Sequence, residues 1–145
     1  MTEACKDPDE DLFARFCQAA VPRPEWTHRA HVKIAYLHLR RFPFDEALSL
    51  VRTRIQALNC ANGIEEGPTM GYNETTTVAF MRIVHATMLA YRATGTADEF
   101  CDAHPQLMTP KVLRLFYSPE RRMDPMAKTT FVEPDLAPLP EYRQS

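Results

Sequence analysis

The chain has 145 residues, a length that folds as one domain and buries roughly 70% of the surface of the unfolded chain. With 45% hydrophobic and 25% charged residues, the composition excludes an intrinsically disordered chain. The net charge of -2, from 17 basic and 19 acidic residues, supplies no basic field for a polyanion, so we expect no nucleic-acid partner. No apolar run is long enough to cross a membrane, so we expect no membrane partner.

The start of the sequence and its cysteines favour a cytoplasmic protein. Residues 1–7 are acidic and polar and do not resemble a secretory signal, which has a basic start and an apolar centre. The cysteines Cys5, Cys17, Cys60 and Cys101 are scattered without a C-x-x-C pair. Because thiols stay reduced in the cytosol, we expect no disulfide and predict that Cys17 and Cys101 are small buried side chains.

Helix-period apolar residues and the positions of helix breakers predict an all-α protein with a single domain over residues 1–145. Long helices are expected over about residues 8–20, 28–40, 47–61 and 72–94, and shorter ones near residues 96–103, 110–117, 119 and 125. The helix over 72–94 is apolar almost all round, which is typical of a buried central helix, and we expect Gly95 to end it. The β-branched run from Thr75 to Val78 leaves a strand start there as an alternative.

The C-terminal part of the chain, from about residue 129, is spaced by prolines and predicts an extended tail that packs on the helices. The expected fold is an irregular up-and-down bundle of about five or six helices with this extended Pro-rich tail. Short connections make neighbouring helices alternate in direction, so the second and fourth helices should run parallel. Their starts would then share one pole of the bundle with the glycine-rich loop over residues 63–71.

The start of the second helix carries the strongest candidate site. Thr27 is placed to cap this helix through its hydroxyl group. His28 falls on the face of the apolar stripe that begins at Val32, and His31 falls at the edge of that stripe. A second histidine is not needed to start a helix, so His31 is the stronger sign of a functional site.

Glu74, at the start of the fourth helix, is the acidic partner expected at the same pole. Two helix starts direct free N–H groups and partial positive charge into the space between them, which favours an anionic ligand and lowers the pKa of a nearby histidine. His28 and His31 would then be neutral and would act with Glu74 as catalytic acid–base groups. The same three residues are candidate ligands of a divalent transition metal, the one cofactor that the pattern suggests.

Structural roles remain alternatives for these residues. His28 could cover the edge of the core while bonding a backbone group, and Glu74 could simply favour the helix dipole. Four further side chains are expected to line the pocket: Trp26, Tyr36, Tyr72 and Asn73.

The remaining polar candidates lie further from the expected pole. We expect His38 on the surface at the far end of its helix, and His85 and His104 in structural positions. The sequence leaves open whether His85, His104, Glu133 or Asp135 reaches the site.

Three short motifs are distributed along the chain: Trp26-Thr27-His28-Arg29-Ala30-His31-Val32, Tyr72-Asn73-Glu74-Thr75 and Phe131-Val132-Glu133-Pro134-Asp135-Leu136. Together they resemble a group of small bacterial all-helical proteins that are mostly uncharacterised. The resemblance covers most of the chain from about Trp26 onward and implies no established activity. The pattern of the group often has histidine where this chain has Asn73, and this departure removes one ligand that a metal site could use.

Two functions of different classes therefore stand. The first is a small-molecule enzyme that uses His28, His31 and Glu74 in acid–base or metal-assisted chemistry on a compact, anionic organic substrate. The sequence does not distinguish a lyase, an isomerase or a hydrolase. The second is a non-catalytic helical binding or protein-interaction module with structural histidines, for which a homodimer or another partner is expected.

Overall fold

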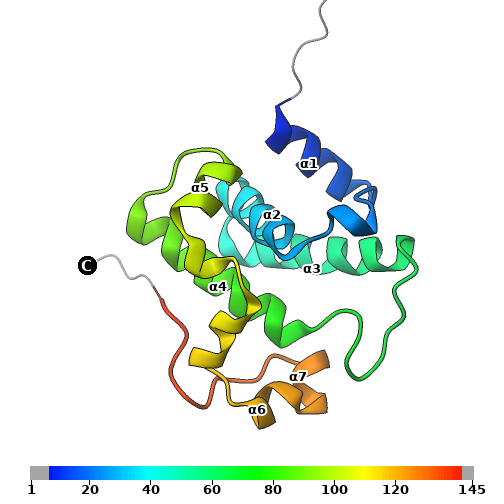
Figure 1. The fold of residues 1–145 in the computed structure, drawn as a ribbon, viewed down its shortest axis with the longest axis vertical. Helices are drawn as coiled ribbons and strands as arrows, with labels where there is room; N and C mark the ends of the chain where they lie inside the picture. The colour runs from blue at the N-terminus through cyan, green and yellow to red at the C-terminus, as the bar shows by residue number, and fades with distance from the viewer. Residues whose placement is uncertain (1–6, 142–145) are drawn as a thin grey trace, which may run out of the picture.

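The computed structural model describes residues 7–141, and within them the chain forms helices and no named strand. The long helices are α1 (Pro8–Cys17), α2 (His28–Arg41), α3 (Phe44–Ala61) and α4 (Glu74–Tyr91) (Figure 1). The shorter elements are η1 (Arg23–Glu25), α5 (Ala97–Ala103), η2 (Pro105–Leu107), η3 (Pro110–Leu115), α6 (Pro119–Met123) and α7 (Pro125–Thr129). The prediction of an all-α fold with a Pro-rich C-terminal region is confirmed. No helix in this part of the chain is long and apolar enough to span a membrane.

Capping side chains set the starts of α2 and α4. The hydroxyl of Thr27 accepts a hydrogen bond from the backbone N–H of Ala30 at 3.2 Å, as predicted for α2. Asn73 caps α4 by accepting from the N–H of Thr76 at 2.9 Å. Because this cap starts a helix at once, the alternative of a strand over residues 75–78 is wrong.

Two helices end earlier than predicted. α1 ends at Cys17, and Ala19 has a left-handed backbone with a φ of 54°. α4 ends at Tyr91, because Arg92 has a left-handed backbone with a φ of 51°. The chain therefore leaves the helix before it reaches Gly95. The prediction that Gly95 ends the helix is therefore wrong, since a non-glycine residue makes the left-handed turn.

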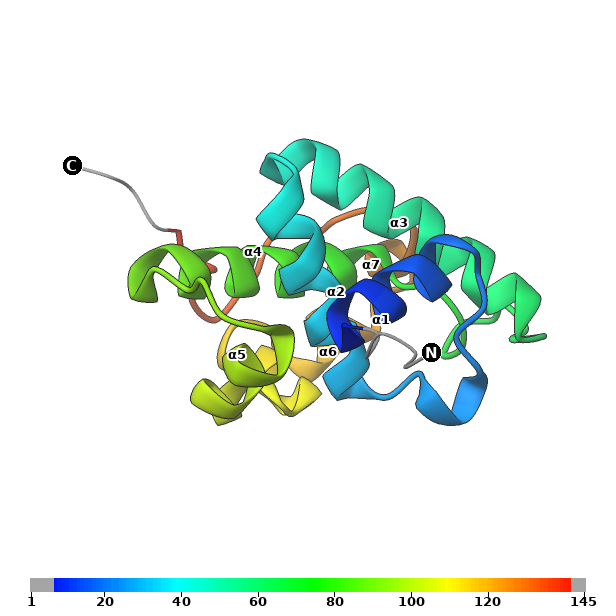
Figure 2. The same ribbon diagram turned by 90° about the horizontal axis from the view of Figure 1, so that it is seen from above.

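The most completely buried helix is α2, which packs against α1, α3, α4 and α5 (Figures 1 and 2). Six consecutive residues of α2, from Ile34 to Leu39, are buried, which no helix with a single apolar face could show. The sequence predicted this central place for the helix over 72–94. α4 is well buried too, but α2 is the helix that the others surround.

His38 is fully buried in the structure, so its predicted surface position is wrong. Its Nδ1–H donates to the carbonyl of Ile34 at 2.8 Å, and Arg54 donates to Nε2 at 2.8 Å. The rings of Phe13 and Phe16 lie against it. Burial is possible here because both ring nitrogens have a partner.

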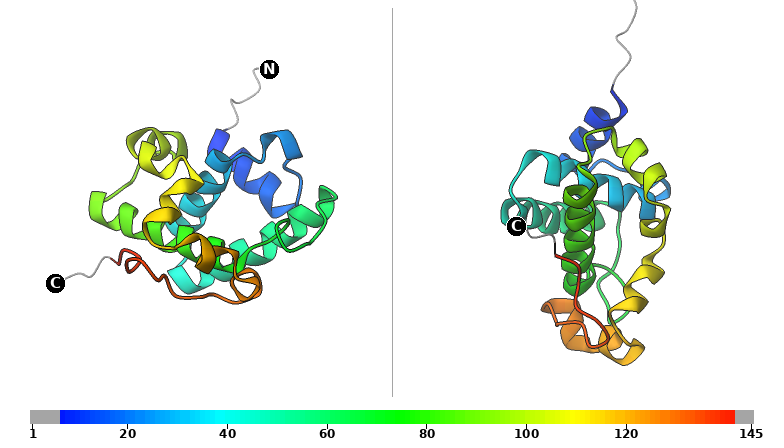
Figure 3. Two further views of the ribbon diagram at one scale, coloured as in Figure 1. Left: turned by 60° about the horizontal axis from the view of Figure 1, so that its bottom comes forward. Right: turned by 90° about the vertical axis from the view of Figure 1, so that its left-hand side faces the viewer.

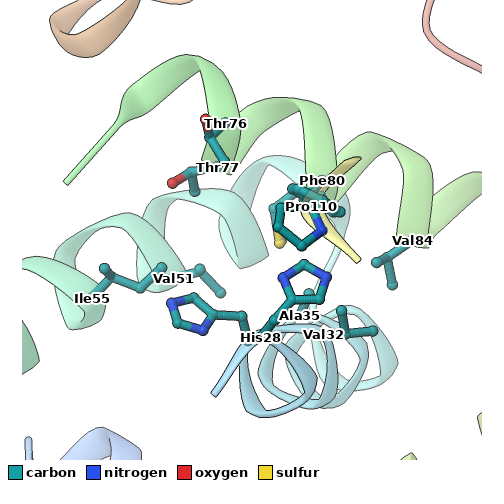
Figure 4. Close-up of a pocket in the computed structure, with 12 residues that line it drawn as sticks. His28, Val32, Ala35, Val51, Ile55, Thr76, Thr77, Phe80, Val84 and Pro110 are labelled. Carbon is teal, nitrogen blue, oxygen red and sulfur yellow. The ribbon is translucent and has the colours of Figure 1, made fainter. Parts of the chain in front are cut away.

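α2 crosses α4 instead of running parallel to it (Figures 2 and 4). The chain turns from α2 into α3 through only Phe42 and Pro43, and Phe42 is extended, as expected before a proline. This short corner sends α3 away at an angle rather than back along α2. The predicted pole with two parallel helix starts is therefore not formed.

The C-terminal segment runs beside α4 after α7 (Figure 3). Val132 and Leu139 are buried, and the hydroxyl of Tyr117 donates to the carbonyl of Val132 at 2.8 Å. The hydroxyl of Thr75 donates to the carbonyl of Thr130 at 3.0 Å, which fixes the segment to the start of α4.

The cysteines of the described residues are free thiols. Cys101 is buried, as predicted, whereas Cys17 is exposed at the end of α1, where the chain leaves the core. Cys60 is exposed, and Cys5 lies outside the described residues.

Candidate functional site

A cavity of about 270 Å³ lies where α2 crosses α3 and α4, and we call it the histidine cavity. Its lining residues come from α2, α3, α4 and η3: His28, His31, Val32, Ala35, Val51, Ile55, Thr76, Thr77, Phe80, Met81, Val84 and Pro110. Figure 4 looks along α2, with His28 and Val32 below and the side chains of α4 above. Most of the lining is apolar, and four polar side chains interrupt it, so the cavity has the composition usual for small-molecule sites.

His31 contributes a ring nitrogen that is ready to accept a proton. A carbonyl can only accept, so the 2.7 Å contact between Nδ1 and the carbonyl of Thr27 places the proton on Nδ1. In the neutral ring, Nε2 then carries the lone pair. The indole of Trp26 covers the imidazole, with the ring centroids 3.8 Å apart.

The surroundings of His31 keep its ring neutral. Burial lowers the pKa of His31 below its ordinary value and outweighs the opposite effect of the hydrogen bond to Thr27, while nearby His28 lowers the pKa further. The physical cause is desolvation, since an imidazolium in this apolar setting would lose its hydration. A neutral imidazole can act as a base or as a hydrogen-bond acceptor at neutral pH.

His28 is held by the segment that follows α5. The contact of 2.8 Å between Nε2 and the carbonyl of Leu107 places its proton on Nε2. The ring meets Phe80 edge to face, with the centroids 5.1 Å apart. The structural role that the sequence left open for His28 is thus present, because the ring bonds a backbone group at the edge of the core.

α4 supplies the polar wall opposite the histidines. The hydroxyl of Thr77 donates to the carbonyl of Asn73 at 2.9 Å and so is committed to the helix. Thr76 lies beside it in the lining of the cavity and is part-exposed. A ligand in the cavity therefore meets Thr76 and the two histidines, through Nε2 of His31 and Nδ1 of His28, as its polar neighbours.

Glu74 does not join the histidines. Its carboxylate accepts hydrogen bonds from Arg52 at 2.8 and 2.6 Å and from the hydroxyl of Tyr72 at 2.6 Å. It lines a different cavity, with Arg52, Tyr72 and Lys128 among its neighbours. Residues 74 and 76 of one helix face nearly opposite directions, so α4 directs Glu74 away from the histidine cavity when it directs Thr76 into it.

The predicted metal-ligand set is not assembled. Within residues 7–141 no group of three or more His, Cys, Asp and Glu side chains is placed to hold a metal ion. His28, His31 and Glu74 fail as a set because Glu74 belongs to the ion pair with Arg52. The lining of the histidine cavity contains no carboxylate and no thiol, so the imidazoles have no anionic partner for a divalent cation there.

The four side chains expected to line the pocket have other places. Trp26 packs against His31 with the two rings tilted, but it is absent from the cavity lining. Tyr36 is fully buried and donates its hydroxyl proton to the carbonyl of Gly95. Tyr72 lines the cavity of Glu74, and Asn73 caps α4 beside a further cavity.

The residues whose reach the sequence left open do not line the histidine cavity. His85 packs against Phe44, and His104 packs between Tyr91 and Phe100. Asp135 accepts hydrogen bonds from the backbone and hydroxyl of Ser118 at the start of α6, and the backbone carbonyl of Glu133 accepts one from Arg121.

Sequence reasoning missed the apolar walls of the cavity. Val51 and Ile55 are four residues apart on α3 and so share a face, and the same spacing joins Thr76, Phe80 and Val84 on α4. These stripes are visible in the sequence, but a stripe that lines a cavity looks the same as one that fills the core. Pro110 carried no signal at all, because it arrives from a distant part of the chain.

Comparison of the chain with family models, with curated proteins and with solved structures finds no match in any of the three.

Proposed function

We propose that the protein binds a compact organic molecule in the histidine cavity and that His31 acts on it as a general base. The observation that supports this proposal is the state of His31. Its Nδ1–H is committed to Thr27, its lowered pKa keeps the ring neutral, and its Nε2 is left with a lone pair beside an apolar cavity. The lowered pKa keeps the lone pair of Nε2 free at neutral pH, and the apolar lining limits the water that could compete with a ligand for it.

The volume and lining limit the ligand to a small and largely apolar body. About 270 Å³ is near the lower end of the roughly 300–1,000 Å³ that ligand pockets usually have. Val32, Val51 and Phe80 give such a body apolar surface to cover. Thr76, which also lines the neighbouring cavity, can orient one polar group of the ligand. Glu74, which the sequence placed in this chemistry, is not part of the proposed machinery.

The test uses nitrobenzisoxazole, a compact aromatic compound that reports on a base in an apolar cavity. The base takes the proton from the ring carbon, the N–O bond breaks, and a coloured cyanophenolate forms. We expect the protein to accelerate this reaction and the His31→Gln variant to be slower by about tenfold or more. The rate should fall as pH drops through the pKa of His31, because the protonated ring has no lone pair.

The matched control is His85→Gln, which removes another part-buried histidine with a burial-lowered pKa, outside the cavity. It should leave the rate unchanged. Ile55→Trp should fill part of the cavity with a larger side chain and abolish the acceleration while the circular dichroism spectrum stays helical. Equal rates for the wild-type protein and His31→Gln would contradict the base role, and insensitivity to Ile55→Trp would contradict the location.

A non-catalytic interaction module is the second candidate, and one observation favours it. Several large apolar side chains of the C-terminal region are more than half exposed: Leu115, Met123, Met126 and Leu136. A self-associating protein could cover such side chains in a homodimer. Light scattering of the purified protein tests this second function. If it is correct, the protein is a dimer at micromolar concentration and Met126→Glu dissociates it. A strict monomer contradicts self-association.

A further inference from the structure

Arg122 on α6 stands out among the part-buried arginines of residues 7–141 because its guanidinium makes no hydrogen bond and no ion pair. Its Nε is buried and makes no hydrogen bond, and Arg122 takes part in no ion pair. The other part-buried arginines each have a hydrogen-bond, ion-pair or aromatic partner: Arg15, Arg29, Arg52, Arg54, Arg82 and Arg121. A buried N–H group without an acceptor destabilises the fold, so we expect a ligand to supply an acceptor for the guanidinium of Arg122.

The side chain of Arg122 lines a compartment of about 280 Å³ next to the histidine cavity. The two spaces share two lining residues, Thr76 and Pro110, and therefore adjoin at the start of α4. The lining of the compartment is much more polar than that of the histidine cavity and includes Asn73 and Asp124. An apolar space and a polar space thus lie side by side, one with a neutral imidazole and the other with an unpaired guanidinium.

We infer that the ligand of the histidine cavity is an amphipathic anion whose carboxylate or similar oxyanion pairs with Arg122. This inference rests on the proposed function and adds the class of substrate to it. The apolar body of the ligand occupies the histidine cavity, and its anionic group passes Thr76 into the compartment of Arg122. A guanidinium offers two parallel N–H groups, which match the two oxygens of an oxyanion.

The other charged groups of the compartment are already committed. Lys128 donates to Glu66 at 2.8 Å and to the carbonyl of Tyr72 at 2.6 Å. Asp124 uses one carboxylate oxygen to cap α7, by accepting from the N–H of Met126. Arg122 is therefore the cation left to meet a ligand. The start of α4, with its partial positive charge, adds to the attraction.

The experiment compares three ligands with one aromatic body: phenylethanol, phenylacetate and phenyl phosphate. Their dissociation constants are measured by titration of the full chain followed by NMR. We expect the wild-type protein to bind phenylacetate about tenfold more tightly than phenylethanol. Arg122→Gln should remove this preference and leave the affinity for phenylethanol unchanged. The matched control, Arg114→Gln, removes an exposed arginine outside the compartment and should keep the preference.

Phenyl phosphate separates the two kinds of anion. If it also loses affinity in Arg122→Gln, the inference holds, and the tighter of the two anions in the wild-type protein identifies the preferred group. Thermal unfolding supplies a second readout, because the removal of an unpaired guanidinium breaks no hydrogen bond and should not lower Tm. A large fall in Tm would show a structural role for Arg122 and overturn the inference.

The outcomes separate the inference from the proposed function. Equal affinities for phenylacetate and phenylethanol, with both lost in Ile55→Trp, overturn the inference and leave the histidine cavity as the binding site. A preference for phenylacetate that survives Arg122→Gln has the same meaning. Affinities that do not respond to Ile55→Trp overturn the proposed function, and the inference with it.

Discussion

Arg52 holds both carboxylate oxygens of Glu74, with Nε 2.8 Å from Oε1 and Nη2 2.6 Å from Oε2. This two-point ion pair joins α3 to the start of α4. It engages Glu74, the acid that the sequence analysis had assigned to the histidines. It leaves the histidine cavity without a carboxylate, so a base role there falls to an imidazole. The pair therefore decides which chemistry is open to the site.

Replacement of Glu74 by glutamine is expected to cost stability and not reactivity. Burial raises the pKa of Glu74, but the hydrogen bonds from Arg52 and Tyr72 outweigh burial, so the pKa lies below 4.5. A carboxylate with a depressed pKa stabilises the fold above the unfolded pKa, and this contribution is lost as pH falls through the folded pKa. We expect Glu74→Gln to lower the free energy of unfolding by about 1–2 kcal/mol at pH 7.

Urea unfolding at pH 7 and pH 3 measures this effect, and the deficit of Glu74→Gln should shrink at pH 3. Glu65→Gln is the control, because Glu65 is exposed and its side chain makes no hydrogen bond or ion pair with the described residues. A large loss of nitrobenzisoxazole reactivity in Glu74→Gln would contradict this prediction and show that the carboxylate takes part in the reaction.

The buried His38 should make the protein sensitive to mild acid. Burial lowers the pKa of His38 to about 4 from 6.5, and the nearby charge of Arg54 acts in the same direction. The unfolded chain takes up a proton at a higher pH than the folded one, so stability falls as pH drops from 6.5 towards 4. Shifts of this size are worth up to about 3 kcal/mol at the acid end.

Equilibrium unfolding between pH 7 and pH 4 measures that loss. His38→Phe should be less stable at pH 7, because Arg54 loses its acceptor, but it should show a shallower fall with acid. If the two proteins lose stability in parallel over this range, His38 is not the group responsible.

Trp26 should control the pKa of His31. Its indole covers the imidazole, and burial is the main cause of the lowered pKa of His31. Trp26→Ala lets water reach the ring, so the pKa of His31 should move back up towards 6.5. NMR titration of the histidine ring protons measures the change, and His85 in the same spectra serves as the unaffected reference. An unchanged pKa would show that α2 and α3, and not Trp26, shield the ring of His31 from water.

Tyr117 should hold the C-terminal segment in place. Its hydroxyl donates to the carbonyl of Val132 at 2.8 Å within the core. Tyr117→Phe keeps the ring and removes this bond, so we expect a loss of about 1 kcal/mol and faster amide exchange in residues 130–139. Tyr91→Phe, at an exposed tyrosine, should change neither quantity. Unaltered exchange in Tyr117→Phe would show that apolar burial alone anchors the segment.

The sequence predicted the start of α2. The Thr27 cap and the first helical residue His28 follow from a side chain that bonds the nearest backbone group. For α4 the predicted start at residue 72 is two residues early, because Asn73 caps the helix and Glu74 is its first residue. The all-α class follows from the spacing of apolar residues, which is a property of each segment alone. Such features need no knowledge of distant contacts, because the interacting groups are three or four residues apart.

The tertiary structure decided which of these residues meet. The two-residue corner at Phe42 and Pro43 sets the direction of α3, so α2 crosses α4 and the predicted pole is not formed. Arg52 then captures Glu74, while Arg122 comes to lie beside Thr76 from a part of the chain about forty-six residues away. His38 is buried by packing from α1 and α3, which its own helix does not reveal. Helix starts are settled by local hydrogen bonds, whereas the pairing of charges depends on crossing geometry that only the packed core determines.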